Sequence, residues 1–317
     1  MKRVGLLIIP ALICGMLFLK CDKGELFESE FIKGLTLNNY PKVDGSTSTL
    51  PLNTVVACEL LGINYSWEKE HPNLQEWKIE PDLKRSGKFW NKIKSSQTHQ
   101  SFINLIDKNT DLVLSARKMS PDEINYAKDA RISLIETPIA IDAFIFIVNQ
   151  ANQTVSLSIE QIQDIYTGKI TNWKEVGGYN DAKINPYIRN ANSGSQELME
   201  VLVMKDLDIL EFPISFEVIN TMTGAFDKVV NDVDGICYTV YYFKENILRD
   251  IRTKNIAIEG IRPNKDSIKD KTYPLVAEVY AVIRSDLDKS SMAYKVYEWL
   301  QTDEGKQVIS KSGYLPN

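Results

Sequence analysis

From Pro41 onward, apolar residues along the chain form short continuous runs that alternate with amphipathic segments of helical period. Nearly continuous runs of Val, Ile and aromatic residues are typical of buried strands. The predicted strands are Asp111–Ser115, Ile139–Val148, Gly235–Val240 and Val276–Ile283. The predicted helices are Leu50–Leu61, Ser101–Lys108, Ile159–Tyr166, Gln196–Met204 and Ala293–Leu300. This alternation of strands and helices predicts an α/β fold with mostly parallel sheets.

An earlier apolar run, Val4–Leu19, follows two basic residues and ends just before Cys21. A basic start and a hydrophobic segment are typical of an export signal, and this run is short for a membrane span of about 20 residues. The residues around Cys21 resemble the lipobox of bacterial lipoproteins, although a small residue is usual where Lys20 stands. We therefore predict a signal peptide over residues 1–20 and a lipid-anchored tether over residues 21–36. The alternative is an uncleaved anchor helix, and both interpretations place the rest of the chain outside the inner membrane.

Three predicted helices begin alike, with a turn rich in Ser and Thr ahead of the apolar-periodic segment. These turns are residues 45–49, 95–98 and 193–195. Each turn alone is typical of an ordinary N-cap, and Ser193 with Gln196 forms a possible capping box. Hydroxyls and free N–H groups at a helix start also make a small anion site. Three such starts, if they converge, would surround a tetrahedral oxyanion.

Arg189 stands four residues before Ser193 and would supply positive charge to such a site. A guanidinium presents a planar fork that matches two oxygens of an oxyanion. Gly194, in the same turn, permits a close approach of the backbone. The alternative, an arginine on a loop surface, stays open on spacing alone.

The composition excludes several other classes of function. The net charge of −5 argues against nucleic acid as a partner. The length of 317 residues favours two lobes over a single core. No His/Cys cluster or Ser-His-Asp arrangement accompanies the two histidines, so we expect no metal, no cofactor and no enzyme activity. Cys58 and Cys237 are expected to be buried free thiols, with a disulfide as the alternative.

Seven short motifs follow one another along the chain in a recognisable order. They are Asp44–Ser48, Asp111–Ser115, Ile165–Trp173, Arg189–Ser195, Asp234–Tyr238, Tyr273–Pro274 and Gly313–Pro316. With them, the chain resembles the phosphate-binding proteins of ABC importers, within the type II periplasmic binding protein superfamily. The resemblance runs from about Tyr40 to Pro316, and the Tyr-Thr-Gly-Lys-Ile-Thr-Asn-Trp stretch that ends at Trp173 is its most specific part.

The resemblance implies two α/β lobes joined by two hinge crossings. Lobe 1 would take residues 37–140 and 275–317, and lobe 2 would take residues 141–274. It implies a monomeric lipoprotein of the cell envelope that captures phosphate, or a similar tetrahedral oxyanion, and delivers it to an ABC permease. A phosphate-sensing or scaffold lipoprotein without transport is the alternative. A phosphatase is a third class, which the lack of metal ligands or an activated nucleophile argues against.

The family's ligand residues map onto the three hydroxyl-rich turns and the arginine. By this resemblance the ligand-binding residues are Thr47, Ser48, Thr98, Arg189, Ser193, Gly194 and Ser195. Further candidates beside them are Ser46, His99, Ser115, Arg117, Asp44 and Asp142.

One position departs from the family pattern. Members that select phosphate over sulfate often place an Asp where Ala116 stands, and that carboxylate accepts a hydrogen bond from a protonated ligand oxygen. Asp44 and Asp142 are the candidates to replace it, while Arg117 either adds charge to the cleft or is solvated. Residues 63–94 form a longer stretch than expected, which we interpret as an insertion that caps a lobe, with a docking surface as the alternative.

Overall fold

The structure is a computed structural model that describes residues 27–71, 75–178, 181–209, 218–219 and 221–317. The predicted signal peptide and the predicted lipidation site, Cys21, lie outside the described residues. Within the part of the chain that the structure describes, no helix is long and apolar enough to cross a membrane.

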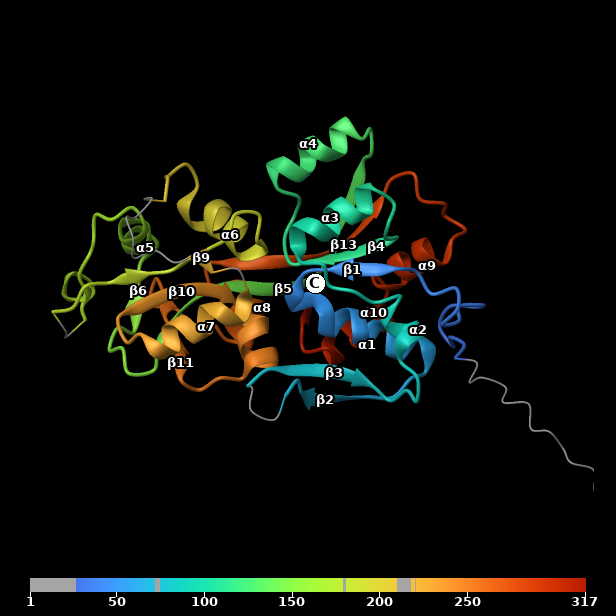
Figure 1. The fold of residues 1–317 in the computed structure, drawn as a ribbon, viewed down its shortest axis with the longest axis horizontal. Coiled ribbons are helices and arrows are strands. Elements are labelled where there is room, and N and C mark those ends of the chain that lie inside the picture. Colours follow the sequence, from blue (N-terminus) through green and yellow to red (C-terminus); the bar gives the residue numbers. More distant parts are fainter. Residues whose placement is uncertain (1–26, 72–74, 179–180, 210–217, 220) are drawn as a thin grey trace, which may run out of the picture.

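Eight strands join one large sheet, whose main path runs β1-β4-β13-β5-β10-β7, while β11 and β14 also pair with β5 (Figure 1). These strands are β1 (Val43–Gly45), β4 (Leu112–Ser115), β5 (Leu134–Asn149), β7 (Asn185–Pro186), β10 (Gly235–Val240), β11 (Thr253–Asn255), β13 (Val276–Arg284) and β14 (Leu315–Pro316). Three two-stranded pairs consist of β2 (Tyr65–Lys69) with β3 (Trp77–Pro81), β6 (Ser156–Leu157) with β12 (Ala257–Ile258), and β8 (Ile188–Arg189) with β9 (Val218–Ile219). All four predicted strands are present.

The longest strand, β5, connects the two halves of the sheet. Its first part pairs with β13, where Ala143 lies opposite Val276. Its last part pairs with β10, where Phe144 lies opposite Val240. One continuous strand thus passes from the half built on β1, β4 and β13 to the half built on β10 and β7.

The prediction of mostly parallel sheets was wrong. Only β1–β4 and β10–β7 pair in parallel within the large sheet, whereas β5 runs antiparallel to β10, β11, β13 and β14. The two strands that connect the halves run in opposite directions, so the ladder between them is antiparallel. A continuous apolar run predicts a buried strand but contains no information on its direction.

Helices cover both faces of the sheet, with α1 and α3 on opposite sides (Figure 1). The helices are α1 (Leu50–Leu61), α2 (Gly87–Trp90), α3 (Thr98–Ile106), α4 (Pro121–Asp129), α5 (Ile159–Tyr166), α6 (Gly194–Leu198), α7 (Met222–Asn231), α8 (Lys265–Lys269), α9 (Met292–Trp299) and α10 (Asp303–Lys311). Short 3₁₀ segments are η1 (Thr47–Thr49) and η2 (Trp173–Val176), and π-helical segments are η3 (Met199–Met204) and η4 (Phe243–Leu248). All five predicted helices occur, and the one predicted over residues 196–204 is α6 continued by η3.

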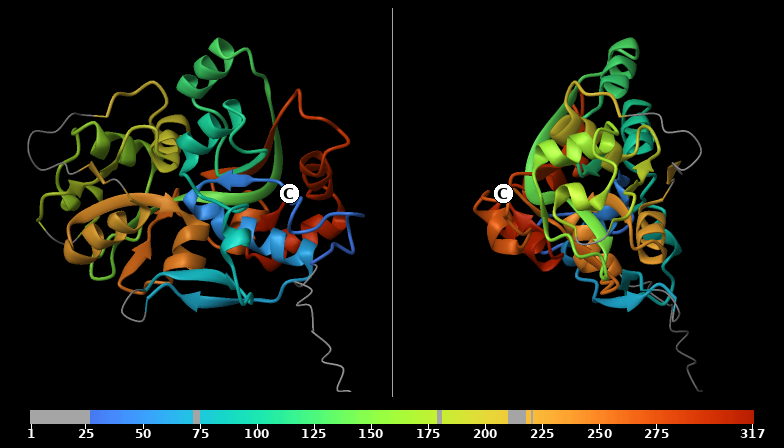
Figure 2. Two further views of the ribbon diagram at one scale, coloured as in Figure 1. Left: turned by 45° about the vertical axis from the view of Figure 1, so that its right-hand side comes forward. Right: turned by 90° about the vertical axis from the view of Figure 1, so that its left-hand side faces the viewer.

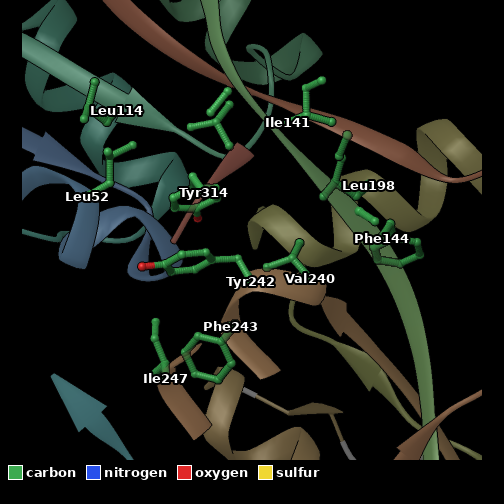
Figure 3. Close-up of a cluster of buried hydrophobic side chains, with 14 of the residues drawn as sticks. Leu52, Leu114, Ile141, Phe144, Leu198, Val240, Tyr242, Phe243, Ile247 and Tyr314 are labelled. Atoms are coloured by element: carbon green, nitrogen blue, oxygen red, sulfur yellow. The ribbon is translucent and has the colours of Figure 1, made fainter. Parts of the chain in front are cut away.

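A buried apolar cluster runs continuously between the halves of the sheet (Figure 3). At its centre the rings of Tyr242 and Tyr314 stack with their centroids 3.7 Å apart and their planes 4° from parallel. Cys58 and Cys237 are buried in the same cluster as free thiols, which confirms that prediction. Burial raises the pKa of each thiol to about 12, so neither is present as a reactive thiolate at neutral pH.

Residues 63–94 contain the β2–β3 hairpin and α2. Figures 1 and 2 show the hairpin along one edge of the molecule, beside α1. Its strand β3 packs against α1 and also against η4, which follows β10. The stretch therefore does more than cap one half of the sheet, because it contacts elements of both halves.

Asp142 lies in β5 just before the strand passes from one half of the sheet to the other. Its Oδ1 accepts hydrogen bonds from the backbone N–H groups of Ala143 at 2.8 Å and Tyr242 at 2.9 Å. The residue is buried, and no described group bonds its Oδ2. Burial raises the pKa of Asp142 to about 7, although the two N–H donors act in the opposite direction.

We predict that Asp142→Asn raises the free energy of unfolding at pH 8 and flattens its dependence on pH. A carboxyl whose pKa is raised in the folded state contributes stability below its unfolded pKa of about 4 and loses it as the pH rises through about 7. Asparagine keeps an acceptor for both N–H groups and cannot ionise, so the gain at pH 8 is at most about 4 kcal/mol. Urea unfolding of both proteins from pH 4 to 8 measures the difference, and parallel curves would contradict the prediction.

Candidate functional site

The first hydroxyl-rich turn begins where β1 ends. Gly45 is required there because a Cβ would come within 2.3 Å of the carbonyl oxygen of Leu114. Asp44 Oδ1 accepts hydrogen bonds from the N–H groups of Gly45 and Ser96, both at 2.8 Å. Its Oδ2 accepts a hydrogen bond from the Asn104 amide at 2.8 Å. Asp44 therefore ties the first turn to the second, and it does not line the cavity described below.

Hydroxyl groups of the first and second turns bond each other. Thr98, the first residue of α3, donates a hydrogen bond to Ser46 Oγ at 2.9 Å, and the N–H of Ala116 donates to the same oxygen at 3.0 Å. Because this oxygen accepts twice, the Ser46 proton is left to donate elsewhere. The hydroxyl of Tyr314 donates to the carbonyl of Ser48 at 3.1 Å and so holds the first turn from behind.

The third turn caps α6 and fixes Arg189 beside it. Ser193 Oγ accepts a hydrogen bond from the N–H of Gln196 at 3.1 Å, as half of the predicted capping box. The other half does not form, because the Ser193 N–H donates to Asn190. The Gln196 side-chain oxygen instead accepts bonds from the Arg189 N–H at 3.3 Å and from the Tyr238 hydroxyl. Gln196 thus sets the position of the Arg189 backbone.

The starts of α3 and α6 lie directly against each other (Figures 1 and 2). A Cβ added to Gly194 would lie 2.6 Å from Thr98 Oγ1. Helix α3 packs on β1 and β4, whereas α6 packs on β10, so this contact joins the two halves of the sheet. The close approach depends on glycine at this one position.

These groups surround a cavity of about 260 Å³. Its lining includes most of the residues singled out in the sequence, namely Ser46, Thr47, Ser48, Thr98, Arg189, Ser193, Gly194 and Ser195. Further lining residues are Glu76, Gln97, Ala116, Leu198, Thr221, Met222, Thr223 and Val240. The N–H groups of Thr98, Gly194 and Ser195, which line the cavity, belong to the first turns of α3 and α6 and so have no partners within those helices.

Among the described lining residues, Arg189 and Glu76 are the ionisable ones. Arg189 is 5% exposed. Burial lowers the pKa of its guanidinium, and Cys237 and Tyr238 oppose that shift. An arginine stays protonated in proteins. The cavity therefore holds a buried positive charge among hydroxyl groups.

Five of the six further candidates lie outside the cavity, Asp44 among them. Arg117 was expected either in the cleft or in solvent, and it is in neither place. It is buried and forms two hydrogen bonds to Glu123, at 2.7 and 2.8 Å, because a buried guanidinium needs a paired carboxylate. His99 Nδ1 lies 3.0 Å from the same carboxylate, and Ser115 Oγ donates to the Arg117 carbonyl at 2.6 Å. Asp142 lies in β5, bonded to backbone N–H groups.

Several lining residues were not predicted from the sequence. Thr221 accepts a hydrogen bond from the Gly224 N–H at 3.0 Å and caps α7, whose start carries Thr223. The Thr-Met-Thr-Gly run at the start of this amphipathic helix is the same kind of signal as the three recognised turns. Glu76 gave no comparable signal, because its place at the cavity depends on how the β2–β3 hairpin packs.

Residues 72–304 match the PBP superfamily domain. The chain belongs to the PBP superfamily. Similar curated proteins include the phosphate-binding protein PstS of Staphylococcus haemolyticus, 25% identical over 323 residues, which cover 99% of this chain and 93% of the relative. The PstS protein of Staphylococcus epidermidis strain RP62A is 27% identical over 292 residues, or 89% of this chain and 80% of the relative.

Solved structures resemble this PBP-superfamily protein over most of its length. An ABC-type phosphate transport receptor from Vibrio cholerae has a TM-score of 0.62 and 23% identity, and the match covers 87% of this chain and 98% of that one. A protein described as a phosphate ABC transporter substrate-binding protein with bound phosphate, from Clostridium perfringens, has a TM-score of 0.63 and 22% identity at the same coverages. These likenesses confirm the predicted two-lobed α/β fold, while the lobe boundaries stay a prediction.

We predict that Gly194→Ala weakens the binding of a tetrahedral oxyanion at this cavity about tenfold. The added methyl group overlaps Thr98 Oγ1, and such overpacking typically costs about 1–3 kcal/mol. Isothermal titration calorimetry measures the affinity. Gly87→Ala is the matched control, since a Cβ there meets nothing within 4 Å. Unchanged affinity in Gly194→Ala would mean that α3 and α6 do not meet in the ligand-bound protein.

Proposed function

We propose that this protein captures phosphate outside the cytoplasm, as the substrate-binding component of an ABC importer. The observation that carries the proposal is the cavity in which three hydroxyl-rich helix starts meet the buried Arg189. Relatives named phosphate-binding protein PstS support phosphate as the ligand. A membrane permease would receive the phosphate, and the protein would act as a monomer and perform no chemistry on its ligand.

The composition of the cavity suits a desolvated oxyanion. Taking such an ion out of water is costly unless hydrogen bonds replace its hydration. Hydroxyls and helix-start N–H groups can direct many donors at one small volume, and the arginine adds a charge-assisted, two-pronged contact. We assign this donor role to Ser46, Thr47, Ser48, Ser193 and Ser195, and we assign Thr98 to holding Ser46 in place.

We propose that the ligand bridges the two lobes. The first two turns belong to the predicted lobe 1, residues 37–140 and 275–317, and the Arg189 turn belongs to the predicted lobe 2, residues 141–274. An anion that needs donors from both lobes binds the closed arrangement better, so it shifts the population toward closure. The strands β5 and β13 would act as the hinge.

We predict that Arg189→Ala weakens phosphate binding at least about 100-fold, roughly 3 kcal/mol, because the bound anion loses its charged donor. Arg189→Lys should recover part of this loss, since it restores the charge without the fork. Calorimetric titration with phosphate measures both variants. Arg252→Ala is the control, because it removes the same charge from a residue that does not line the cavity and pairs with Asp250. Equal affinities of Arg189→Ala and wild type would contradict the proposed site.

We propose further that Cys21 carries a lipid that holds the protein at the membrane. The mature chain should begin at Cys21, and mass spectrometry of membrane-extracted protein should show an acylated cysteine. Cys21→Ala should release or misprocess the protein without reducing phosphate affinity, because no residue of the tether is among the candidate ligand-binding residues. An intact Met1, or an unmodified Cys21 in the mature chain, would rule out this anchor.

A further inference from the structure

The β2–β3 hairpin brings a carboxylate to the cavity. Glu76 directly precedes β3 and lines the cavity beside the start of α7. Its Oε2 accepts a hydrogen bond from Thr223 Oγ1 at 3.4 Å, and its carbonyl accepts one from the Glu70 N–H at 2.8 Å. Among the described residues that line the cavity, Glu76 is the one carboxylate.

Stacking on an arginine fixes the hairpin that carries Glu76. The Arg249 guanidinium lies 4.5 Å from the ring centroid of Trp77 and 4.9 Å from that of Trp67. Trp67 lies opposite Ile79 in the ladder and Trp77 opposite Lys69, so the two indoles project from the same face of the hairpin. Arg249 is the C-cap of η4, the segment that follows β10. Its contacts with the two indoles therefore join the hairpin to the other half of the sheet.

The other acidic candidates are engaged elsewhere. Both carboxylate oxygens of Asp44 accept hydrogen bonds, from Gly45, Ser96 and Asn104. Asp142 accepts hydrogen bonds from backbone N–H groups within the sheet. Among the residues that the structure describes, Thr223 is the one hydrogen-bond partner of the Glu76 carboxylate, through a long bond.

A carboxylate beside a bound anion is unfavourable unless a proton lies between them. Phosphate keeps one or two protons at neutral pH, and a P–OH group can donate to a carboxylate oxygen. Sulfate keeps no proton at neutral pH. Its oxygens and those of the carboxylate would therefore face each other as hydrogen-bond acceptors, with no donor between them. Burial, with the charges of Glu70 and Asp227, raises the pKa of Glu76, while Thr223 lowers it. In these surroundings the ionised carboxylate is unfavourable unless it accepts a hydrogen bond.

We propose that Glu76 selects protonated oxyanions: its carboxylate accepts a hydrogen bond from the P–OH of bound hydrogen phosphate and disfavours sulfate. This inference rests on the proposed phosphate-binding function. It gives residues 63–94 a specificity role, in place of an acidic residue at Ala116.

Competition titrations of phosphate against sulfate at neutral pH test the proposal on the full mature chain. Wild type should prefer phosphate by more than about 100-fold, and Glu76→Gln should lower that ratio at least about tenfold by weakening phosphate and strengthening sulfate binding. Glu76→Ala should lower it as well, which guards against a folding defect peculiar to one variant. Glu70→Gln is the matched control, because it removes one charge from the same hairpin at a residue that does not line the cavity and pairs with Lys78.

The outcomes separate this inference from the proposed function. A wild type that binds no phosphate removes the proposed function and the selectivity role with it. A wild type that binds phosphate tightly, with the same ratio in both Glu76 variants, overturns the role of Glu76 alone. An equal fall of the ratio in Glu70→Gln also overturns it, because it would trace selectivity to the net charge of the hairpin.

Discussion

The contact between the starts of α3 and α6 is the constraint on which the rest of the site depends. Gly194 lies against Thr98, and Thr98 in turn donates to Ser46, so one short path of atoms joins all three hydroxyl-rich turns. An anion taken out of water needs many donors in a small volume, and the donors that line the cavity come from both halves of the sheet. The two halves must therefore meet at the ligand, and only a glycine lets them come this close.

Several groups that do not line the cavity keep the donors in place. Asp44 joins the first two turns, Gln196 fixes the Arg189 backbone, and Tyr314 bonds the carbonyl of Ser48. The bonds of Gln196 and Tyr314 are buried and that of Asp44 is partly buried. Each involves a backbone group, and its loss would leave a polar group unsatisfied. The Gly-Tyr-Leu-Pro motif near the C-terminus thus has a structural reason, since its tyrosine supports a turn far away in the sequence.

Local sequence predicted the parts of the site that local structure builds. Hydroxyl-rich helix starts and the Arg189 spacing are short-range patterns, and the structure brings them together at one cavity. Local sequence did not predict three other features. These are the direction of the strands, the burial of Arg117 against Glu123 and the position of Glu76. Each depends on which distant segments pack together, and no property of the neighbouring residues in sequence determines that. The place of Asp44 outside the cavity lining was not predictable for the same reason, because its partner Asn104 comes from another element.

The proposed function requires one tetrahedral oxyanion to bind between the two halves of the sheet. A crystal structure of the full mature chain with arsenate, a heavier analogue of phosphate, tests it most directly, since arsenic is located by its anomalous scattering. We expect a single arsenic peak per chain, within hydrogen-bonding reach of Arg189, Ser46 and the start of α6. A peak elsewhere on the protein, with an empty cavity, would contradict it.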